Sequence, residues 1–227
     1  MTDKVIHLFR HAEAVHNSES DESTRDPLLT EKGKEQAQEI LETYQFLNQP
    51  TLILTSPLRR AIETVLQAFH PSFNDNAAKV FSATTFPRII ALPHLQEVSE
   101  KPCDTGSSLA SLKSEYGEYV EFPEGFFYCN TWFQKDGTSF SNENSLLSKR
   151  AEFVREYILG QLGEEVIVMT HGDFSHFLVN RWLYGPGCGT LFDGLQHACG
   201  TPMVLKEKST MDSEYEMRLE VPTWFGR

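Results

Sequence analysis

Three short apolar runs, each followed by a segment with helical periodicity, constrain the fold of this chain more than any other feature of its sequence. The runs are KVIHLF (4–9), TLILT (51–55) and EVIVMT (165–170). Runs that are apolar along most of their length are typical of buried strands, and alternation of strands with helices favours a mostly parallel sheet covered on both faces. We therefore predict an α/β fold with three αβα layers. Because the sequence contains no repeat or low-complexity linker, we expect a single domain over residues 1–227.

Periodicity and capping residues predict the remaining elements. Thr30 is the expected N-cap of a helix within LTEKGKEQAQEILETYQFL (29–47), and Ser56-Pro57 is expected to cap and begin the helix after the second strand. Further helices are expected at 108–116, 142–162 and 173–183, short strands at KVFSA (79–83) and RIIAL (88–92), and a closing hairpin at PMVLKE (202–207) and EYEMRLE (214–220).

The stretch from residue 100 to 141 breaks this rhythm. It combines several prolines and glycines with a dense set of aromatic residues between Tyr116 and Phe133. A long connection of this kind within a compact α/β fold is often functional, so we expect an aromatic-rich excursion over the site that roofs the pocket. Packing of the same rings into a small satellite core is an equally good interpretation.

Composition and charge narrow the functional classes. The net charge of −12 argues against broad binding to nucleic acid or to anionic membranes, and no apolar run approaches the ~20 residues of a membrane span. The N-terminus shows neither a basic region nor a cleavage site, so we expect a cytoplasmic protein, with nuclear entry left open. The four cysteines form no C-x-x-C pair, and a zinc site from Cys188, His197 and Cys199 would lack such a pair. Nothing in the sequence indicates the oligomeric state.

Residues suited to phosphate chemistry follow the strands. LFRH, LTSPLRR and VMTHG deliver Arg10, His11, Arg60 and His171, and the carboxyl ends of parallel strands meet at one edge of a sheet. A neutral imidazole can attack phosphorus, and nearby arginines disfavour its protonation. Guanidinium groups also offer planar pairs of donors to phosphoryl oxygens. We therefore predict a phosphate site at this edge.

Five motifs together resemble the histidine phosphatase superfamily, and the closer match is its phosphoglycerate-mutase-like branch. In chain order they are FRHAEAVHN (9–17), DPLLTEKGKEQA (26–37), SPLRRAIET (56–64), LQE (95–97) and VMTHGD (168–173). The resemblance implies that His11 is the nucleophile that becomes phosphohistidine and that Glu97 is the proton donor. It also implies that the phosphoryl group is bound by Arg10, Arg60 and His171, with Gly172 and Asn17 completing the phosphate-binding set.

Some positions leave alternatives open. Asp173 is a rival proton donor, although we expect it to cap the following helix instead. The histidines at 7, 70, 94, 176 and 197 are expected to be structural or exposed, whereas His16 is close enough in sequence to touch substrate. PCDTG (102–106) resembles a segment of mutase-like proteins from fungi and plants.

The function implied is a metal-independent phosphomonoesterase that acts, without a cofactor, on a small phosphorylated substrate. One alternative is a phosphoglycerate-type mutase, although no segment like the RRSYD motif of true mutases is present. The other is a catalytically retired module that binds a phospho-ligand or a protein. The sequence does not name the substrate.

Overall fold

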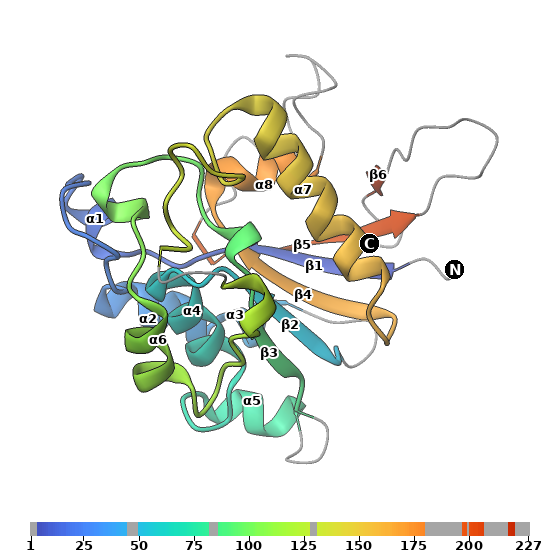
Figure 1. The fold of residues 1–227 in the computed structure, drawn as a ribbon. Coiled ribbons are helices and arrows are strands. Elements are labelled where there is room, and N and C mark those ends of the chain that lie inside the picture. The colour runs from blue at the N-terminus through green and yellow to red at the C-terminus, as the bar shows by residue number, and fades with distance from the viewer. Residues whose placement is uncertain are drawn as a thin grey trace.

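The structure is a computed structural model that describes residues 4–44, 50–81, 86–127, 131–179, 197–198, 200–206 and 218–220. The described residues form a six-stranded sheet in the order β3-β2-β4-β1-β5-β6 (Figure 1). The strands are β1 (Lys4–Arg10), β2 (Leu52–Thr55), β3 (Arg88–Ala91), β4 (Glu165–Thr170), β5 (Gly200–Lys206) and β6 (Arg218–Glu220). The first four strands of that order are parallel, and β5 and β6 are antiparallel. The mostly parallel sheet and the closing hairpin are therefore confirmed.

Helices cover both faces of the sheet, which confirms the three αβα layers. Alternate residues of β4 enter opposite cores: Ile167 and Met169 pack on one side, and Val166 and Val168 on the other. The first core lies under α2 (Glu31–Gln38), α3 (Ile40–Thr43), α4 (Arg59–Phe69), α5 (Asp75–Val80) and α6 (Leu109–Tyr116). The second lies under α7 (Asn144–Leu159) and α8 (Gly172–Leu178). A strand that faces two cores is expected to be apolar on both faces, as β4 is from Val166 to Met169.

Three local predictions differ from the structure. The helix expected at 29–47 is interrupted at Glu39 between α2 and α3, and residues 45–49 lie outside the described part. The strand expected at 79–83 is wrong for residues 79–81, because Lys79 and Val80 form the last turn of α5, whose N-cap Asn74 accepts a hydrogen bond from the backbone of Asn76. Residues 82 and 83 lie outside the described part. Helix α4 begins at Arg59 rather than directly after Ser56, which leaves the serine hydroxyl available to the site.

The excursion between residues 100 and 141 carries η2 (Pro102–Asp104), α6 and η3 (Glu124–Phe126). Its aromatic rings join the first core: Tyr116, Phe122, Phe127 and Trp132 are each less than a tenth exposed. These rings therefore belong to the first core and not to a separate satellite core, and none of the described rings between residues 116 and 133 lines the pocket as a roof. The excursion still lies beside the site through backbone and lysine contacts. Tyr128 lies outside the described residues.

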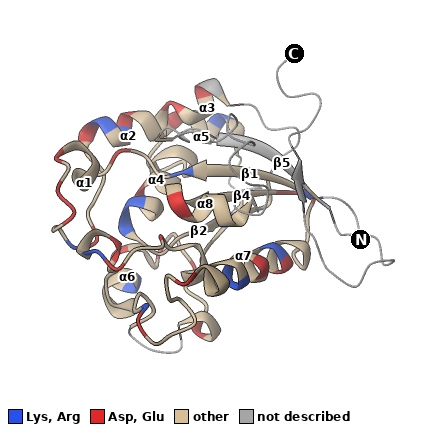
Figure 2. Ribbon diagram, turned by 90° about the horizontal axis from the view of Figure 1, so that it is seen from above, with Lys and Arg blue, Asp and Glu red and all other residues tan. Residues whose placement is uncertain are grey.

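Charge is concentrated on the outside of the molecule. In Figure 2 the charged residues lie mainly on the covering helices and loops, whereas the strands carry few of them. None of the described helices is both long and apolar enough to cross a membrane. α1 (Val15–Ser18) and η1 (Pro93–Leu95) are short elements that flank the carboxyl edge of the sheet.

Candidate active site

The carboxyl edge of the sheet brings the predicted phosphate residues together. Parallel pairing places Arg10 at the end of β1 opposite Thr170 at the end of β4, so His11 and His171 leave the sheet side by side. Their ring centroids are 5.0 Å apart. Arg60, in the first turn of α4, reaches both rings: its Nε lies 3.2 Å from His11 Nε2 and its Nη2 lies 3.1 Å from His171 Nδ1. The predicted cluster is therefore assembled in the structure.

His11 is held as a neutral imidazole. Its ring is 2% exposed, and Nδ1 lies 2.7 Å from the carbonyl oxygen of Ala12, an acceptor that requires the proton on Nδ1. The Nε2 lone pair consequently faces Arg60. Burial lowers the pKa of His11 well below its usual value, and the charges of Arg60 and Arg10 lower it further. The unprotonated nitrogen is the one that points into the pocket.

His171 is neutral for similar reasons, but both of its nitrogens are engaged. Nδ1 accepts from Arg60, and Nε2 lies 2.7 Å from the hydroxyl of Ser56. Burial and then the charge of Arg60 lower its pKa well below the usual value. Ser56 therefore fixes the ring of His171 and does not cap α4.

Arg60 is 1% exposed and is held from several sides. Nη1 donates to the carbonyl oxygen of Cys103 at 2.6 Å, and Nη2 pairs with the Asp104 carboxylate at 2.7 Å. The second oxygen of that carboxylate accepts from Ser99, and the Asp104 carbonyl accepts from the buried amine of Lys135 at 3.0 Å. Burial lowers the pKa of Lys135 to about 8.

Asp104 was not among the predicted site residues. The PCDTG motif had been noted only for its resemblance to other proteins. A sequence spacing gives no indication that an aspartate 44 positions after Arg60 pairs with it, because the pairing depends on how η2 folds back over α4.

Glu97 lies where the proton donor was predicted. It follows η1, and its carboxylate accepts the backbone N–H groups of Asp173 at 3.2 Å and Phe174 at 2.9 Å. Burial raises the pKa of Glu97 to about 7, and the nearby charges of Asp104 and Asp173 contribute to the rise. A carboxyl group with a pKa near 7 can donate and accept a proton at neutral pH.

The expectation that Asp173 caps α8 is wrong. The N-cap is His171, no side chain bonds at that cap, and Asp173 sits in the first turn. The free N–H groups of that turn are satisfied by Glu97, which arrives from a different part of the chain.

The other predicted phosphate-binding residues line the same pocket. Gly172 lies beside the Arg10 guanidinium, whose carbon would be 3.5 Å from a Cβ at this position, an ordinary contact distance. Asn17 Oδ1 accepts from the backbone of Ala14, and Asn17 Nδ2 lies 3.0 Å from His16 Nε2. Asn17 therefore orders the loop at the pocket wall, and contact of its amide with a phosphoryl group stays a prediction.

His197 also lies at the site, although it was expected to be structural or exposed. Its ring centroid is 5.7 Å from that of His11, and the backbone N–H of Ala198 donates to the Arg10 carbonyl at 3.2 Å. Burial lowers the pKa of His197 to about 4. The residue precedes β5, whose antiparallel pairing with β1 carries it to this edge. No local motif marks it.

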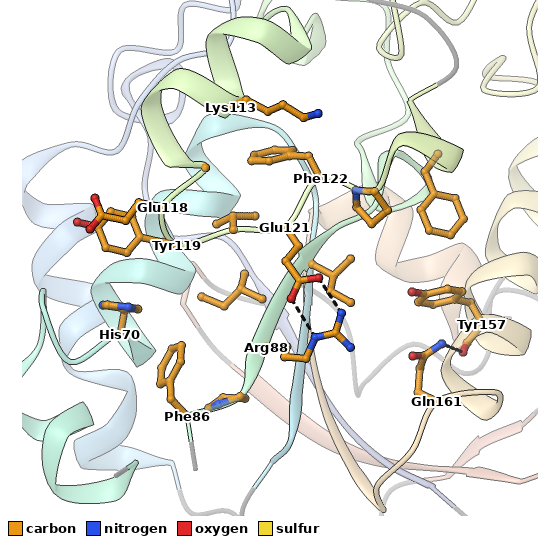
Figure 3. Close-up of a pocket in the computed structure, with 17 residues that line it drawn as sticks. His70, Phe86, Arg88, Lys113, Glu118, Tyr119, Glu121, Phe122, Tyr157 and Gln161 are labelled. Carbon is orange, nitrogen blue, oxygen red and sulfur yellow. Dashed lines mark hydrogen bonds and ion pairs between the residues drawn. The ribbon is translucent and has the colours of Figure 1, made fainter. Parts of the chain in front are cut away.

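A polar pocket of about 310 Å³ is lined by Arg10, His11, Asn17, Arg60, Glu97, Asp104 and Gly172. A larger hollow of about 970 Å³ lies at the β3 edge of the sheet (Figure 3), lined by aromatic rings around an exposed ion pair between Arg88 and Glu121. None of the predicted phosphate residues lines that hollow, so the smaller pocket is the candidate active site. Among the described residues, no group of three or more His, Cys, Asp or Glu side chains is arranged to hold a metal ion.

Comparison with known proteins identifies the family of this chain. The sequence pattern of the histidine phosphatase superfamily (branch 1) matches residues 6–201. The chain belongs to this superfamily. A Schizosaccharomyces pombe protein described as a probable phosphatase is 30% identical over 120 residues, which cover 52% of this chain and 51% of the relative, so that match spans about half of each protein.

Two further similarities are to phosphoglycerate-mutase-like members of the superfamily. A phosphoglycerate mutase-like protein of Arabidopsis thaliana is 26% identical over 216 residues, covering 82% of this chain and 76% of the relative. The phosphoglycerate mutase structure from Bacillus anthracis superposes with a TM-score of 0.51 at 18% identity, over 89% of this chain and 88% of that one. At that identity the structure supports the fold alone. Membership and the phosphatase-named relative together indicate an enzyme of the phosphatase and mutase class.

Proposed function

We propose that this protein is a metal-independent phosphomonoesterase that hydrolyses a small phosphorylated substrate through a phosphohistidine at His11. The observation that carries the proposal is the state of His11, whose Nδ1 bonds to the Ala12 carbonyl while Nε2 faces Arg60. A nucleophilic imidazole needs its reacting nitrogen unprotonated, and this arrangement supplies it.

In the first step, His11 Nε2 attacks phosphorus while the bond from phosphorus to the ester oxygen breaks. Arg10 and Arg60 stabilise the charge on the three other phosphoryl oxygens, the work that a metal ion performs in many phosphatases. Arg60 Nε must then turn its hydrogen bond from the imidazole nitrogen to a phosphoryl oxygen. The guanidinium remains anchored by Cys103 and Asp104 during that exchange.

Glu97 provides the proton that the departing alkoxide needs. With a pKa of about 7, a large fraction of Glu97 is protonated at neutral pH before the bond breaks. In the second step, the ionised Glu97 takes a proton from water as the water oxygen attacks the phosphohistidine. The P–N bond breaks, phosphate leaves, and neutral His11 and protonated Glu97 are restored.

The test is turnover of p-nitrophenyl phosphate in the presence of EDTA, with His11→Ala as the comparison. We expect metal-free turnover by the wild-type protein and none by the variant, with circular dichroism showing that the variant is folded. Quenched reactions should contain an enzyme-bound phosphate that is labile in acid and stable in base. Activity lost on chelation and restored by a divalent ion would refute metal independence, and an acid-stable adduct would identify another nucleophile.

The same experiment separates the alternatives. A mutase would pass the phosphoryl group to an added alcohol acceptor faster than to water, which product analysis detects. A retired module would bind phosphate but form no phosphoenzyme. Catalysis is favoured over a role in binding alone, because the pocket combines Arg10 and Arg60 with the neutral imidazole of His11. It also contains Glu97, a carboxyl group with a pKa near 7.

A further inference from the structure

Both positive and negative side chains line the candidate pocket. Arg10, Arg60 and Lys101 supply positive charge, but four carboxylates line the same pocket: Glu22, Glu97, Asp104 and Asp173. The pocket therefore holds at least as much potential negative charge as positive before any substrate enters. In this pocket, a dianionic phosphoryl group is stabilised only where Arg10 and Arg60 face it.

The buried part of this balance is the pair between Arg60 and Asp104. The two groups are 2.7 Å apart, and their side chains are 1% and 7% exposed. Little water is present to screen this pair, so Asp104 offsets much of the charge that Arg60 presents. Arg10 and Arg60 can therefore balance the charge of one phosphoryl group, but they leave little positive charge for a second anion.

At the mouth of the pocket, a positively charged side chain is likewise paired with a negatively charged one. Lys101 is 2.7 Å from Glu22, and both side chains are about half exposed. Backbone contact between Cys103 N–H and the Glu22 carbonyl, at 3.1 Å, keeps the two segments together. Asp173, exposed on the first turn of α8, lies on the Glu97 side, where the leaving oxygen would have to be.

The stretches outside the described residues bring no surplus of positive charge either. They contain three lysines and arginines against six aspartates and glutamates in total, over residues 1–3, 45–49, 82–85, 128–130, 180–196, 199, 207–217 and 221–227.

We propose that the substrate is a phosphomonoester whose leaving group carries no second anionic group, such as the phosphate ester of a small neutral polyol or amino alcohol. This inference rests on the proposed function, because it places the leaving group beside Glu97. A substrate carboxylate or second phosphate there would face Asp173 and Glu22 and would be repelled. Hydroxyl or ammonium groups would instead donate hydrogen bonds to those carboxylates. The volume of about 310 Å³ suits a leaving group of a few carbon atoms.

The test uses sn-glycerol 3-phosphate and 3-phospho-D-glycerate, which differ by a hydroxymethyl group against a carboxylate. We expect kcat/KM to favour glycerol 3-phosphate by about tenfold or more at low ionic strength, and the preference to narrow as salt rises. Phosphoethanolamine, whose leaving group is cationic, should also be preferred over 3-phosphoglycerate. Equal use of the two glyceryl esters, or a preference for 3-phosphoglycerate, would overturn the inference.

Variants assign the preference to particular carboxylates. Glu22→Gln should narrow the ratio of the two kcat/KM values several-fold, whereas Glu31→Gln should leave it unchanged. The second substitution makes the same change in net charge at an exposed side chain on α2, outside the pocket. A ratio that is the same in both variants as in the wild-type protein would show that the pocket carboxylates do not set the preference.

Binding without turnover separates this inference from the proposed function. Calorimetric titration of His11→Ala, or of His11→Asn if the first variant does not fold, with the same two esters measures charge preference alone. Tighter binding of glycerol 3-phosphate supports the inference even if His11 proves not to be the nucleophile. Tighter binding of 3-phosphoglycerate, or no millimolar binding of either ester, overturns it even if p-nitrophenyl phosphate is hydrolysed through His11.

Discussion

Replacing Asp104 by asparagine separates two effects that this buried carboxylate has on the site. One is electrostatic, because the charge of Asp104 helps to raise the pKa of Glu97 to about 7. The other is positional, because the carboxylate holds Arg60 Nη2 at 2.7 Å and accepts from Ser99. Asparagine keeps the shape and one acceptor oxygen but removes the charge.

The size of the electrostatic effect follows from the arrangement. Two like charges several ångströms apart repel by about 2–3 kcal/mol at an effective dielectric constant of about 20. Since Arg60 offsets part of the charge on Asp104, we take about 1.4 kcal/mol, which equals a tenfold change in a protonation equilibrium. Asp104→Asn should then lower the pKa of Glu97, so that the midpoint of its titration moves about one pH unit towards acid.

The assay is the pH dependence of kcat/KM for glycerol 3-phosphate, which reports transfer to the nucleophile. Glu97 acts in its protonated form, so the rate falls as pH rises through its pKa. In the wild-type protein we expect this fall near pH 7, and in Asp104→Asn about one pH unit lower, which makes the variant about fivefold slower at pH 7. The plateau at lower pH should fall as well, because Arg60 is held less firmly. Removing the charged partner should also destabilise the fold by about 1–3 kcal/mol.

Asp173→Asn is the matched control. Asp173 also helps to raise the pKa of Glu97, but it is exposed, and it is Asp104 that holds Arg60. This variant should move the alkaline fall towards lower pH and leave the plateau close to that of the wild-type protein. If Asp104→Asn changes neither the plateau nor the position of the fall, the carboxylate does not act on the chemistry and the reasoning is wrong.

Three further predictions address other parts of the molecule. Glu97→Gln should slow an alkyl phosphate by about 10²–10⁴-fold but p-nitrophenyl phosphate much less, because nitrophenolate leaves without a proton; equal losses would exclude Glu97 as the acid. Gly106→Ala should lower stability by about 1–3 kcal/mol in thermal unfolding, since its Cβ would lie 2.3 Å from the Trp132 ring, whereas Gly125→Ala, with nothing within 4 Å, should not. The free energy of unfolding should decrease as pH falls from 7 to 5, because the unfolded chain binds protons near the usual histidine pKa of 6.5 while the folded chain does not. The decrease is up to ~1.4 kcal/mol per pH unit for each buried histidine with a strongly lowered pKa. The histidines concerned are His11, His94 and His171, and urea unfolding at several pH values measures the effect.

Most of the sheet can be predicted from the sequence, because the polarity of each strand's residues reflects whether the faces of that strand are buried. The central residues of β2 and β4 are apolar since both faces are covered, and the predicted bounds differ from the observed ones by one residue or less. KVFSA was wrong because a short apolar run does not distinguish a strand from the last turn of a helix. The capping residue that decides the matter, Asn74, lies five positions before that run.

The site was predictable to the extent that it is built on strand ends. His11 and His171 each follow a strand directly, so parallel pairing alone brings them together. Asp104 and His197 were missed because neither directly follows a strand of the parallel sheet, and only tertiary contacts bring them to the site. The aromatic excursion was misplaced for a related reason: composition shows that its rings must be buried but not which core receives them.

The contacts of Glu97 explain how one carboxyl group can serve both halves of the proposed reaction. Backbone N–H groups at the start of α8 stabilise its ionised form, whereas burial and the charges of Asp104 and Asp173 favour its neutral form. Burial and the two carboxylates outweigh the N–H groups, so the pKa rises to about 7. A much higher value would leave a poor acid for the alkoxide, and a much lower value a poor base for the attacking water. α8 begins directly after His171, so the helix whose N–H groups bind Glu97 also fixes the distance between this proton donor and the phosphate-binding side chain of His171.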